Sequence, residues 1–416
     1  MEKFLLWWER SLISALCLSI ALLGIGRVEF FAGGGSMSAW SVSRTTFVFW
    51  CMLKLLLLIR AGWAGTRLAS LESLTPLFLF FSAVTVSLLP DFRQAGDYRY
   101  FFFGCAHAVM LVDMFSAAPQ RRWVPVLLGT LPVILVARGL AHDPSILGFS
   151  LSHRFGYPLD HPNTAGFLFA MSVPLCAVVA MANSGGWRAL ISLSCAGQIS
   201  ALVLTFSRGA WLGFAAAMLY LTVGLKKWKL LAAFAVLAVA CVLVFPSIQD
   251  RLGTVTDPHD DPAMRERLQL LASSVRLGMD NPLFGVGYGR GRLKEPLRAH
   301  LKGSEFAHGP ILHTHNVYVE LFAGTGLVGL FAFLWMIGQT LLRLWRSSLG
   351  RFGTERVLGV GLAAAWIAAI VAGLGDILFY HHETRIFFFT LLGTAHIYYS
   401  SSETNEAFSN SRVGAL

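Results

Sequence analysis

Apolar residues along this chain gather into long runs, and polar residues fill short gaps between them. Most runs approach the ~20 residues that cross a bilayer as a helix, so they predict membrane-spanning segments. The predicted spans, about twelve on this criterion, lie at residues 11–32, 45–61, 74–90, 100–118, 122–140, 164–183, 187–206, 209–225, 229–246, 315–342, 357–375 and 385–400. The pattern therefore predicts an all-α polytopic integral membrane protein.

One long hydrophilic connection, residues 247–314, divides the predicted spans into a first group within 1–246 and a second within 315–400. A polar tail, 401–416, follows the last span. Lys and Arg in short loops mark the cytoplasmic side of a membrane protein. The basic residues of the short loops on the side of both termini are Arg60, Arg67, Arg121, Arg122, Arg188, Lys226, Lys227, Lys229, Arg343, Arg346, Arg351 and Arg356. We therefore expect both termini in the cytoplasm and the long loop 247–314 on the opposite, outer side of the membrane.

Part of the long loop has helical periodicity. The apolar residues of 262–280 that recur at helical spacing are Met264, Leu268, Leu271 and Val275. Asp261 is the expected N-cap, and Pro262 suits the first turn. Arg265 and Arg276 flank one side of this apolar stripe, and Arg267 flanks the other. One interpretation is a helix that lies on the bilayer with its arginines at headgroup height.

A glycine-rich segment, NPLFGVGYGRGRLK at 281–294, follows this helix and contains Arg290. Glycine-rich turns can cradle phosphate, but this one has no Walker lysine and no preceding strand. A flexible return to the membrane is the simpler interpretation.

Composition limits the possible functions. Only 13% of the 416 residues are charged and 55% are hydrophobic, as a membrane protein requires. The net charge of +10 suits anionic lipid or an anionic substrate, whereas the mixed acids and bases of the long loop do not resemble a nucleic-acid surface. All six cysteines lie in apolar runs without a CxxC spacing, so neither disulfides nor a cysteine metal site is expected.

Histidines are concentrated on one side of the predicted topology. Those that fall in outer segments are His142, His153, His161, His259, His300, His308, His313, His315, His381 and His382. Chemistry is therefore expected to face outward. His313 and His315 stand at the mouth of the helix that begins near 315, with only the distant His259 and Asp260 as further metal ligands. Without an HExxH motif or a compact cluster, we expect no metal and no cofactor.

Three other segments bring polar residues to the same outer face. SRGAW places Arg208 at a tight connection between two spans, where a guanidinium needs an anionic partner or a wet cavity. HRFGYPLDHPN at 153–163 adds Arg154, His161 and Asn163, and GDILFYHHETR adds Asp376, His381 and Arg385.

Several of these segments together resemble the O-antigen ligase and polymerase superfamily. His315-Asn316, nine residues and then Gly326-x-x-Gly329-Leu330 resemble its HN(x9)GxxGL signature, and Arg208 with Leu212 resembles its Arg(x3)Leu element. The stretch 267–289, which ends in DNPLFGVGYG, resembles its "R…W…D-x-PLFGxG" segment, and HPN at 161–163 resembles its earlier outer loop. The tryptophan of the third signature is Leu271 here, so the resemblance leaves open whether Arg265 or Arg267 is functional.

The resemblance implies a GT-C-like glycosyltransferase of the bacterial inner membrane with a periplasmic active site. It would transfer preassembled polysaccharide from undecaprenyl diphosphate to a sugar hydroxyl of lipid A-core, with inversion and without a metal. His315 is the expected general base, while Arg208 and either Arg265 or Arg267 hold the diphosphate. The expected substrate-binding residues are His313, Asn316, Arg154, His161, Asn163, Arg276, Arg290, Asp376, His381 and Arg385.

Three alternatives stay open. An O-antigen polymerase and a protein O-oligosaccharyltransferase use the same lipid carrier, and the residues do not separate them from a ligase. A transporter of lipid-linked glycan would place charges near mid-membrane and contain inverted repeats. Lys54 and Asp113 are among the few charges within predicted spans.

Overall fold

The computed structural model describes residues 2–26, 28–29, 36–65, 74–89, 97–116, 118–159, 161–256, 262–301, 306, 313–349, 351–379 and 381–413. Within these ranges the chain is helical apart from a two-residue antiparallel ladder, in which β1 (Val28–Glu29) pairs with β2 (Ser36–Met37). The predicted all-α fold class is confirmed.

Every predicted span overlaps a helix, and 122–140 is divided between two, whereas 11–32 extends beyond the end of the first helix at Ile25. The helices are α1 (Glu2–Ile25), α2 (Ala39–Gly65), α3 (Thr75–Leu88), α4 (Tyr98–Phe115), η3 (Pro119–Arg122), α5 (Trp123–Thr130), α6 (Val133–His142), η4 (Pro144–Gly148), α7 (Pro162–Ala182), α8 (Gly185–Leu204), α9 (Arg208–Gly224), α10 (Trp228–Val244), α11 (Pro246–Thr256), α12 (Pro262–Asp280), α13 (Arg290–His300), α14 (Val317–Leu349), α15 (Gly353–Ala372) and α16 (His382–Val413).

Not every one of these helices is long enough to span a membrane alone. Among the described residues, seven helices have the length and hydropathy to cross a bilayer, or eight if α10 and α11, bent by 94°, form one broken span. The bend occurs where Pro246 begins α11, since proline cannot continue a helix ladder. Because several of the remaining helices are short, the number of spans stays a prediction.

Helices α7 and α15 form the centre of the bundle. In α7, 89% of the span is buried, and α15 contributes the fully buried Trp366. Helix α15 packs on both α7 and α9 through a surface of alanines. This packing fixes the positions at which the central helices end, and the loops at those ends carry the site described below.

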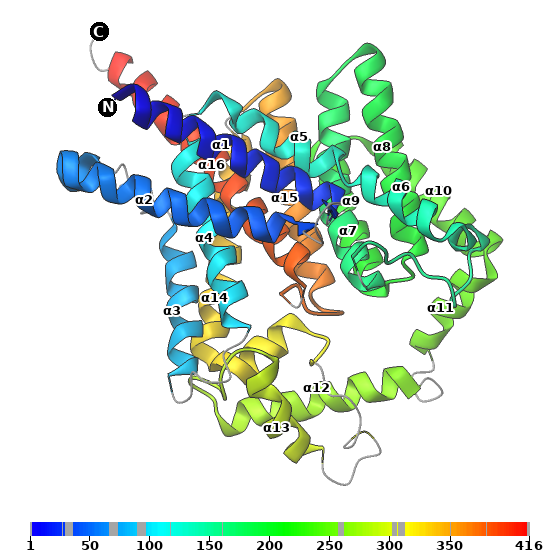
Figure 1. The fold of residues 1–416 in the computed structure, drawn as a ribbon. Coiled ribbons are helices and arrows are strands. Elements are labelled where there is room, and N and C mark those ends of the chain that lie inside the picture. The colour runs from blue at the N-terminus through cyan, green and yellow to red at the C-terminus, as the bar shows by residue number, and fades with distance from the viewer. Residues whose placement is uncertain are drawn as a thin grey trace.

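Helices α12 and α13 form a separate layer at the lower edge of Figure 1, away from the first turn of α1 and the last turn of α16. The predicted amphipathic helix is confirmed at Pro262–Asp280, although Asp261 lies outside the described residues. Its buried side differs from the expected stripe. Leu270 and Leu277 pack against Leu293 and Leu297 of α13 and against Ala323 of α14.

The glycine-rich segment does not form a phosphate loop. The N–H groups of Val286 and Gly287 donate to the carbonyl oxygens of Ala323 and Gly324 at 3.0 and 2.9 Å, so they are already used. Helix α14 breaks at Gly326, where φ is 65°, and a Cβ there would lie 2.2 Å from the Leu283 backbone. The segment is therefore a tight contact that fixes α12 to α14, which corrects the expectation of a flexible return.

Candidate functional site

The segment 313–316 (HTHN) ends at the first turn of α14. The Asn316 side chain caps the helix by accepting from the N–H groups of Tyr318 and Val319, each at 3.0 Å. Its Nδ2 donates to the Leu374 carbonyl at 3.1 Å, just beyond α15. His315 precedes this cap in a left-handed conformation with φ of 54°. Such a conformation is uncommon outside glycine and costs on the order of 1–3 kcal/mol.

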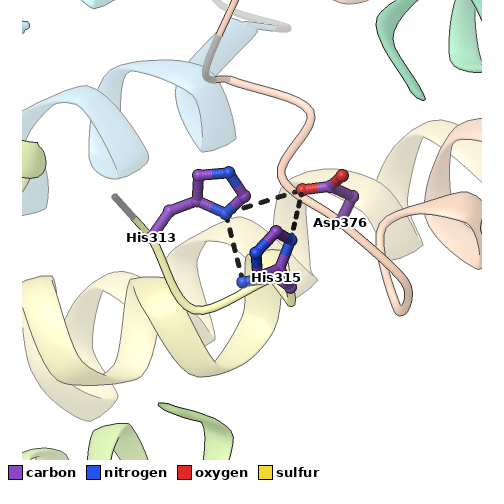
Figure 2. A group of neighbouring side chains, drawn as sticks. All are labelled: His313, His315 and Asp376. Carbon is purple, nitrogen blue, oxygen red and sulfur yellow. Dashed lines mark hydrogen bonds and ion pairs between the residues drawn. The ribbon is translucent and has the colours of Figure 1, made fainter. Parts of the chain in front are cut away.

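Asp376 meets both histidines of this segment. It lies in the loop between α15 and α16 and is 7% exposed. Its Oδ1 is 3.3 Å from Nδ1 of His315 and 3.6 Å from Nδ1 of His313, as Figure 2 shows. The loop is held there by a hydrogen bond of 2.9 Å from the Val317 N–H to the Gly373 carbonyl.

The carboxylate of Asp376 is held in its charged form. Burial acts to raise the pKa of Asp376, but the histidine contacts and the Asn163 amide outweigh it, so the pKa falls below its usual range. A charged carboxylate beside Nδ1 of His315 favours the tautomer with the proton on that nitrogen. Nε2 is then left as the proton acceptor.

His313 has a different environment. Its Nδ1 accepts the backbone N–H of His315 at 3.3 Å, so that lone pair is in use. Burial lowers the pKa of His313 to about 3, although the nearby Asp376 charge opposes this effect. His313 therefore stays neutral and supports the turn that presents His315.

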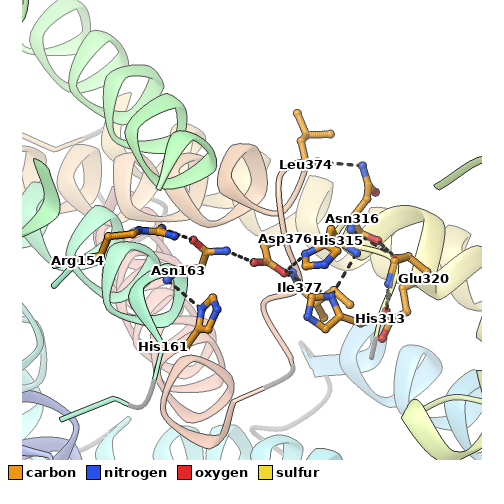
Figure 3. A network of polar contacts seen from close by, with 11 residues as sticks. Arg154, His161, Asn163, His313, His315, Asn316, Glu320, Leu374, Asp376 and Ile377 are labelled. Carbon is orange, nitrogen blue, oxygen red and sulfur yellow. Dashed lines mark hydrogen bonds and ion pairs between the residues drawn. The ribbon is translucent and has the colours of Figure 1, made fainter. Parts of the chain in front are cut away.

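A second set of contacts orients Asp376 from the other side. Asn163, in the first turn of α7, donates from Nδ2 to Asp376 Oδ2 and accepts from Arg154 Nη2 at 3.2 Å. Arg154 in turn donates from Nε to the Thr205 carbonyl at 2.8 Å. Figure 3 shows this chain of contacts running through Asp376 to His315. His161 caps α7 by accepting the Asn163 N–H at 3.1 Å.

His315 opens on a cavity of about 300 Å³ lined by three arginines. Arg208 comes from the start of α9, Arg251 from α11 and Arg267 from α12. Met264, Leu268 and Leu271, three of the four residues of the expected apolar stripe of α12, line the same cavity together with other residues, so this part of α12 covers the site.

The positive charges of this region act on one another. Burial, together with the charges of Arg251, Arg267 and Arg208, lowers the pKa of Arg154 to about 10, against the opposing charge of Asp376. Four guanidinium groups near one carboxylate leave an excess of positive charge. Such an excess in a partly desolvated cavity is suited to a multiply charged anion.

One group of side chains approaches the spacing of a metal site. Ligand atoms of His313, His315 and Asp376 lie within 4.8 Å of one another. However, Nδ1 of His313 already accepts a hydrogen bond, and the surrounding arginines would repel a cation. The arrangement suits an ionised acid and histidine pair better than a cation.

Four of the sequence-predicted residues that the structure describes lie outside both the cavity lining and the contacts around Asp376. Arg265 is on another side of α12 from Arg267, and Arg276 is exposed on the same helix. The side chain of Arg290 lies outside the described part of the structure. His381 stacks on His161 with ring centres 6.0 Å apart. Arg385 is buried and donates from Nε to the Phe379 carbonyl at 2.9 Å, which indicates a packing role.

Arg251 is the cavity residue that the sequence interpretation missed. Its Nε donates to the Phe206 carbonyl at 3.1 Å, so it shares the α8 to α9 turn with Arg154. The sequence feature that could have identified Arg251 was its position shortly after the predicted span 229–246. A guanidinium so close to the hydrocarbon needs a partner or a wet cavity, which is the argument that identified Arg208.

Comparison with known families agrees with the site geometry. Residues 193–334 match the family model described as O-antigen ligase. The matched segment contains His315 and all three arginines of the cavity, whereas Arg154 and Asp376 lie outside it. No curated protein shows a significant match to the chain. The match over residues 193–334 supports assignment of this segment to the O-antigen ligase superfamily.

Proposed function

We propose that this protein is an O-antigen ligase. It would transfer a preassembled polysaccharide from undecaprenyl diphosphate to a sugar hydroxyl of lipid A-core at the periplasmic face of the bacterial inner membrane. The observation that carries the proposal is the His315 and Asp376 pair at the edge of a cavity lined by Arg208, Arg251 and Arg267. The superfamily includes ligase and polymerase types of activity, so the choice of acceptor is the proposed part.

The arginines provide for the leaving group. Breaking the bond between the anomeric carbon and the phosphate oxygen leaves a diphosphate with additional negative charge. Guanidinium groups bind phosphate oxygens in a bidentate manner and stabilise that charge without a metal. Arg208, Arg251 and Arg267 come from three different helices, so they can surround the diphosphate.

His315 and Asp376 provide for the nucleophile. The acceptor hydroxyl oxygen forms a bond to the anomeric carbon while the bond to phosphate oxygen breaks, and its electron pair stays with the diphosphate. Nε2 of His315 takes the hydroxyl proton as this happens. Attack from the side opposite the diphosphate inverts the anomeric centre. Asp376 acts through His315 by fixing its tautomer and orientation, so it is a positioning residue.

The remaining polar residues support this pair. Arg154 and Asn163 orient Asp376, and Asn316 holds the first turn of α14. His161 and His381 lie beyond Asn163, where they are placed to contact the acceptor sugar. We assign both termini and the tail 401–416 to the cytoplasm, and the segment 247–314 to the periplasm between the helices of 1–246 and those of 315–400.

A transporter is a weaker proposal for this chain. The intramembrane charges that favoured it are paired with each other, since Lys54 Nζ is 2.6 Å from Asp113 Oδ2. Trp50 also donates to Asp113, at 2.8 Å. These contacts join α2 to α4. They suit a structural role.

A reconstituted transfer reaction tests the proposal. Purified protein in EDTA is supplied with lipid A-core and undecaprenyl-diphosphate glycan, and the lipopolysaccharide ladder is followed on a gel. We expect a shifted ladder with wild-type protein and with His300→Ala, a control outside the cavity, but not with His315→Ala. Lengthening of carrier-linked glycan with donor alone would identify a polymerase, and glycan on a protein acceptor would identify an oligosaccharyltransferase.

A further inference from the structure

Glu320 is a buried acid in the first turn of α14 that the mechanism above does not use. Its residue is 5% exposed, and it does not line the cavity of about 300 Å³ that contains the three arginines, the arginine cavity. In Figure 3, Glu320 lies to the right of His315 and Asp376 lies to its left. A carboxyl group with so little access to water is costly unless hydrogen-bond donors meet it. The donors therefore show what Glu320 stabilises.

The carboxyl group of Glu320 meets Thr314. The Thr314 N–H donates to Glu320 Oε2 at 3.2 Å. Oγ1 of Thr314 lies 3.4 Å from the same oxygen and 2.9 Å from the Asn316 carbonyl, so its one hydrogen can be donated to either acceptor. The backbone N–H of Glu320 also donates to the Asn316 carbonyl, at 3.0 Å. Glu320 thus contacts the residue before His315 through its side chain and the residue after it through its backbone.

This pair of contacts encloses the left-handed backbone of His315, whose φ is 54°. A conformation of this kind persists only where the surrounding contacts fix it. We infer that Glu320 is a positioning residue, which holds the turn 313–316 so that His315 keeps its contact with Asp376 and presents Nε2 to the acceptor hydroxyl. The inference rests on the proposed function, which makes His315 the base.

Asp376 and Glu320 act on different parts of His315. Asp376 meets the imidazole at 3.3 Å and fixes the position of its proton, whereas Glu320 fixes the backbone that carries the imidazole. Without an acceptor at position 320, the N–H of Thr314 is buried and unsatisfied, because Thr314 is 1% exposed. The turn then rearranges, and His315 moves with it. A displacement of about 1 Å in a reacting group can lower a rate about a hundredfold.

Four variants separate the hydrogen bond from the charge and the volume of the side chain. Glu320→Gln keeps an acceptor oxygen for Thr314 and removes the acid, whereas Glu320→Leu removes the acceptor at a similar volume. Thr314→Val loses the hydroxyl but keeps the N–H that donates to Glu320. Thr340→Val is a matched control, because Thr340 is also buried in α14 and donates to the Met336 carbonyl at 2.8 Å, beyond the first turns.

The experiment measures single-turnover transfer to lipid A-core and direct binding of undecaprenyl-diphosphate glycan by the purified full-length protein. We expect Glu320→Leu to transfer about 10- to 100-fold more slowly than wild type and to bind the donor within about threefold of it. Glu320→Gln should transfer within about threefold of wild type, and Thr314→Val should lose less than Glu320→Leu. Thr340→Val should change neither quantity. In a His315→Ala background, Glu320→Leu should cause no further loss, since it acts through His315.

Wild-type transfer by Glu320→Leu would overturn the inference, as would a Glu320→Gln protein as slow as Glu320→Leu. A loss of donor binding equal to the loss of transfer, or a further loss in the His315→Ala background, would also overturn it, because the effect would then not pass through His315. Failure of the proposed function is distinguishable. In that case wild-type protein lengthens carrier-linked glycan and leaves lipid A-core unmodified, and the same variants are compared in that reaction.

Discussion

Replacing Asp376 with asparagine tests its proposed role in orienting His315 as the base. The carboxylate meets His315 Nδ1 at 3.3 Å, the Ile377 N–H at 2.9 Å and Nδ2 of Asn163. A carboxylate accepts from all of these groups, but an amide has one oxygen and one NH₂ group. In the asparagine variant the NH₂ group has two possible orientations. It faces another donor, Nδ2 of Asn163, or it faces Nδ1 of His315.

The second arrangement reverses the His315 tautomer. An amide N–H that points at Nδ1 makes that nitrogen an acceptor, so the proton moves to Nε2 and the base is lost. Changes that misorient a catalytic histidine in this way cost about 10²- to 10⁴-fold in kcat, or about 3–5 kcal/mol in activation free energy. The donor KM is expected to change little, because the arginines of the cavity stay in place.

Initial rates of glycan transfer at varied donor concentration measure both quantities. Asp143→Asn is a matched control, since Asp143 also contacts a histidine, His153 at 3.4 Å, but lies on an exposed loop. It should keep wild-type kinetics. An Asp376→Asn protein with more than about a third of the wild-type kcat would refute the tautomer argument, as would a loss confined to donor KM.

Three further predictions concern other parts of the structure. Arg267→Ala is expected to raise the donor KM about 10- to 100-fold, because Arg267 lines the cavity. Arg265→Ala, the control on the same helix, should change the donor KM less than about threefold. Equal effects of the two variants in steady-state kinetics would contradict this assignment. Lys54→Met or Asp113→Leu alone should lower the free energy of unfolding by about 3–5 kcal/mol by leaving a buried charge unpaired, and the double replacement should cost much less. Thermal unfolding of all four proteins in detergent tests this cycle, and additive losses would be the opposing result. Finally, burial lowers the pKa of His313 to about 3 in the folded protein, so below pH ~6.5 the unfolded protein binds one more proton at this residue than the folded protein does. The free energy of unfolding therefore falls on acidification, by up to about 1.4 kcal/mol per pH unit. His313→Gln should flatten this slope in denaturation at pH 5 and 7, and an unchanged slope would show that other groups cause it.

The positions of the helices could be predicted from the sequence because length and hydropathy are local properties. Apolar runs as different as 74–90 and 315–342 each coincide with a helix, α3 and α14. The membrane topology is harder to predict. A helix as short as α3 does not reach the usual spanning length alone, and α10 reaches it only if α11, beyond the 94° bend, is counted with it.

Part of the site was also predictable. His315, Arg208 and Arg267 were expected on one face, and the cavity brings them together. The partnership of Asp376 with His315 was not predicted, because it depends on the loop after α15 being held against the first turn of α14. Such a contact between distant segments has no periodicity in the sequence.

The glycine signatures have a physical explanation that the sequence did not reveal. Gly326 of the GxxGL signature lies against Leu283 of the PLFGxG segment, and Gly285 lies against Ala323 and Gly324. A Cβ added at either glycine position would lie within 2.6 Å of the facing backbone. These signatures therefore describe one contact between the segment 281–289 and α14, not a ligand-binding loop.

Comparing donor binding with single-turnover transfer in His315→Ala tests most directly the central claim, which is that His315 acts as the base while the arginine cavity binds the donor diphosphate. Both are measured in EDTA with undecaprenyl-diphosphate glycan, the second after addition of lipid A-core. We predict a donor Kd within about threefold of wild type and a transfer rate lower by about 10²- to 10⁴-fold. Normal transfer by His315→Ala, or loss of donor binding equal to the loss of transfer, would contradict the account.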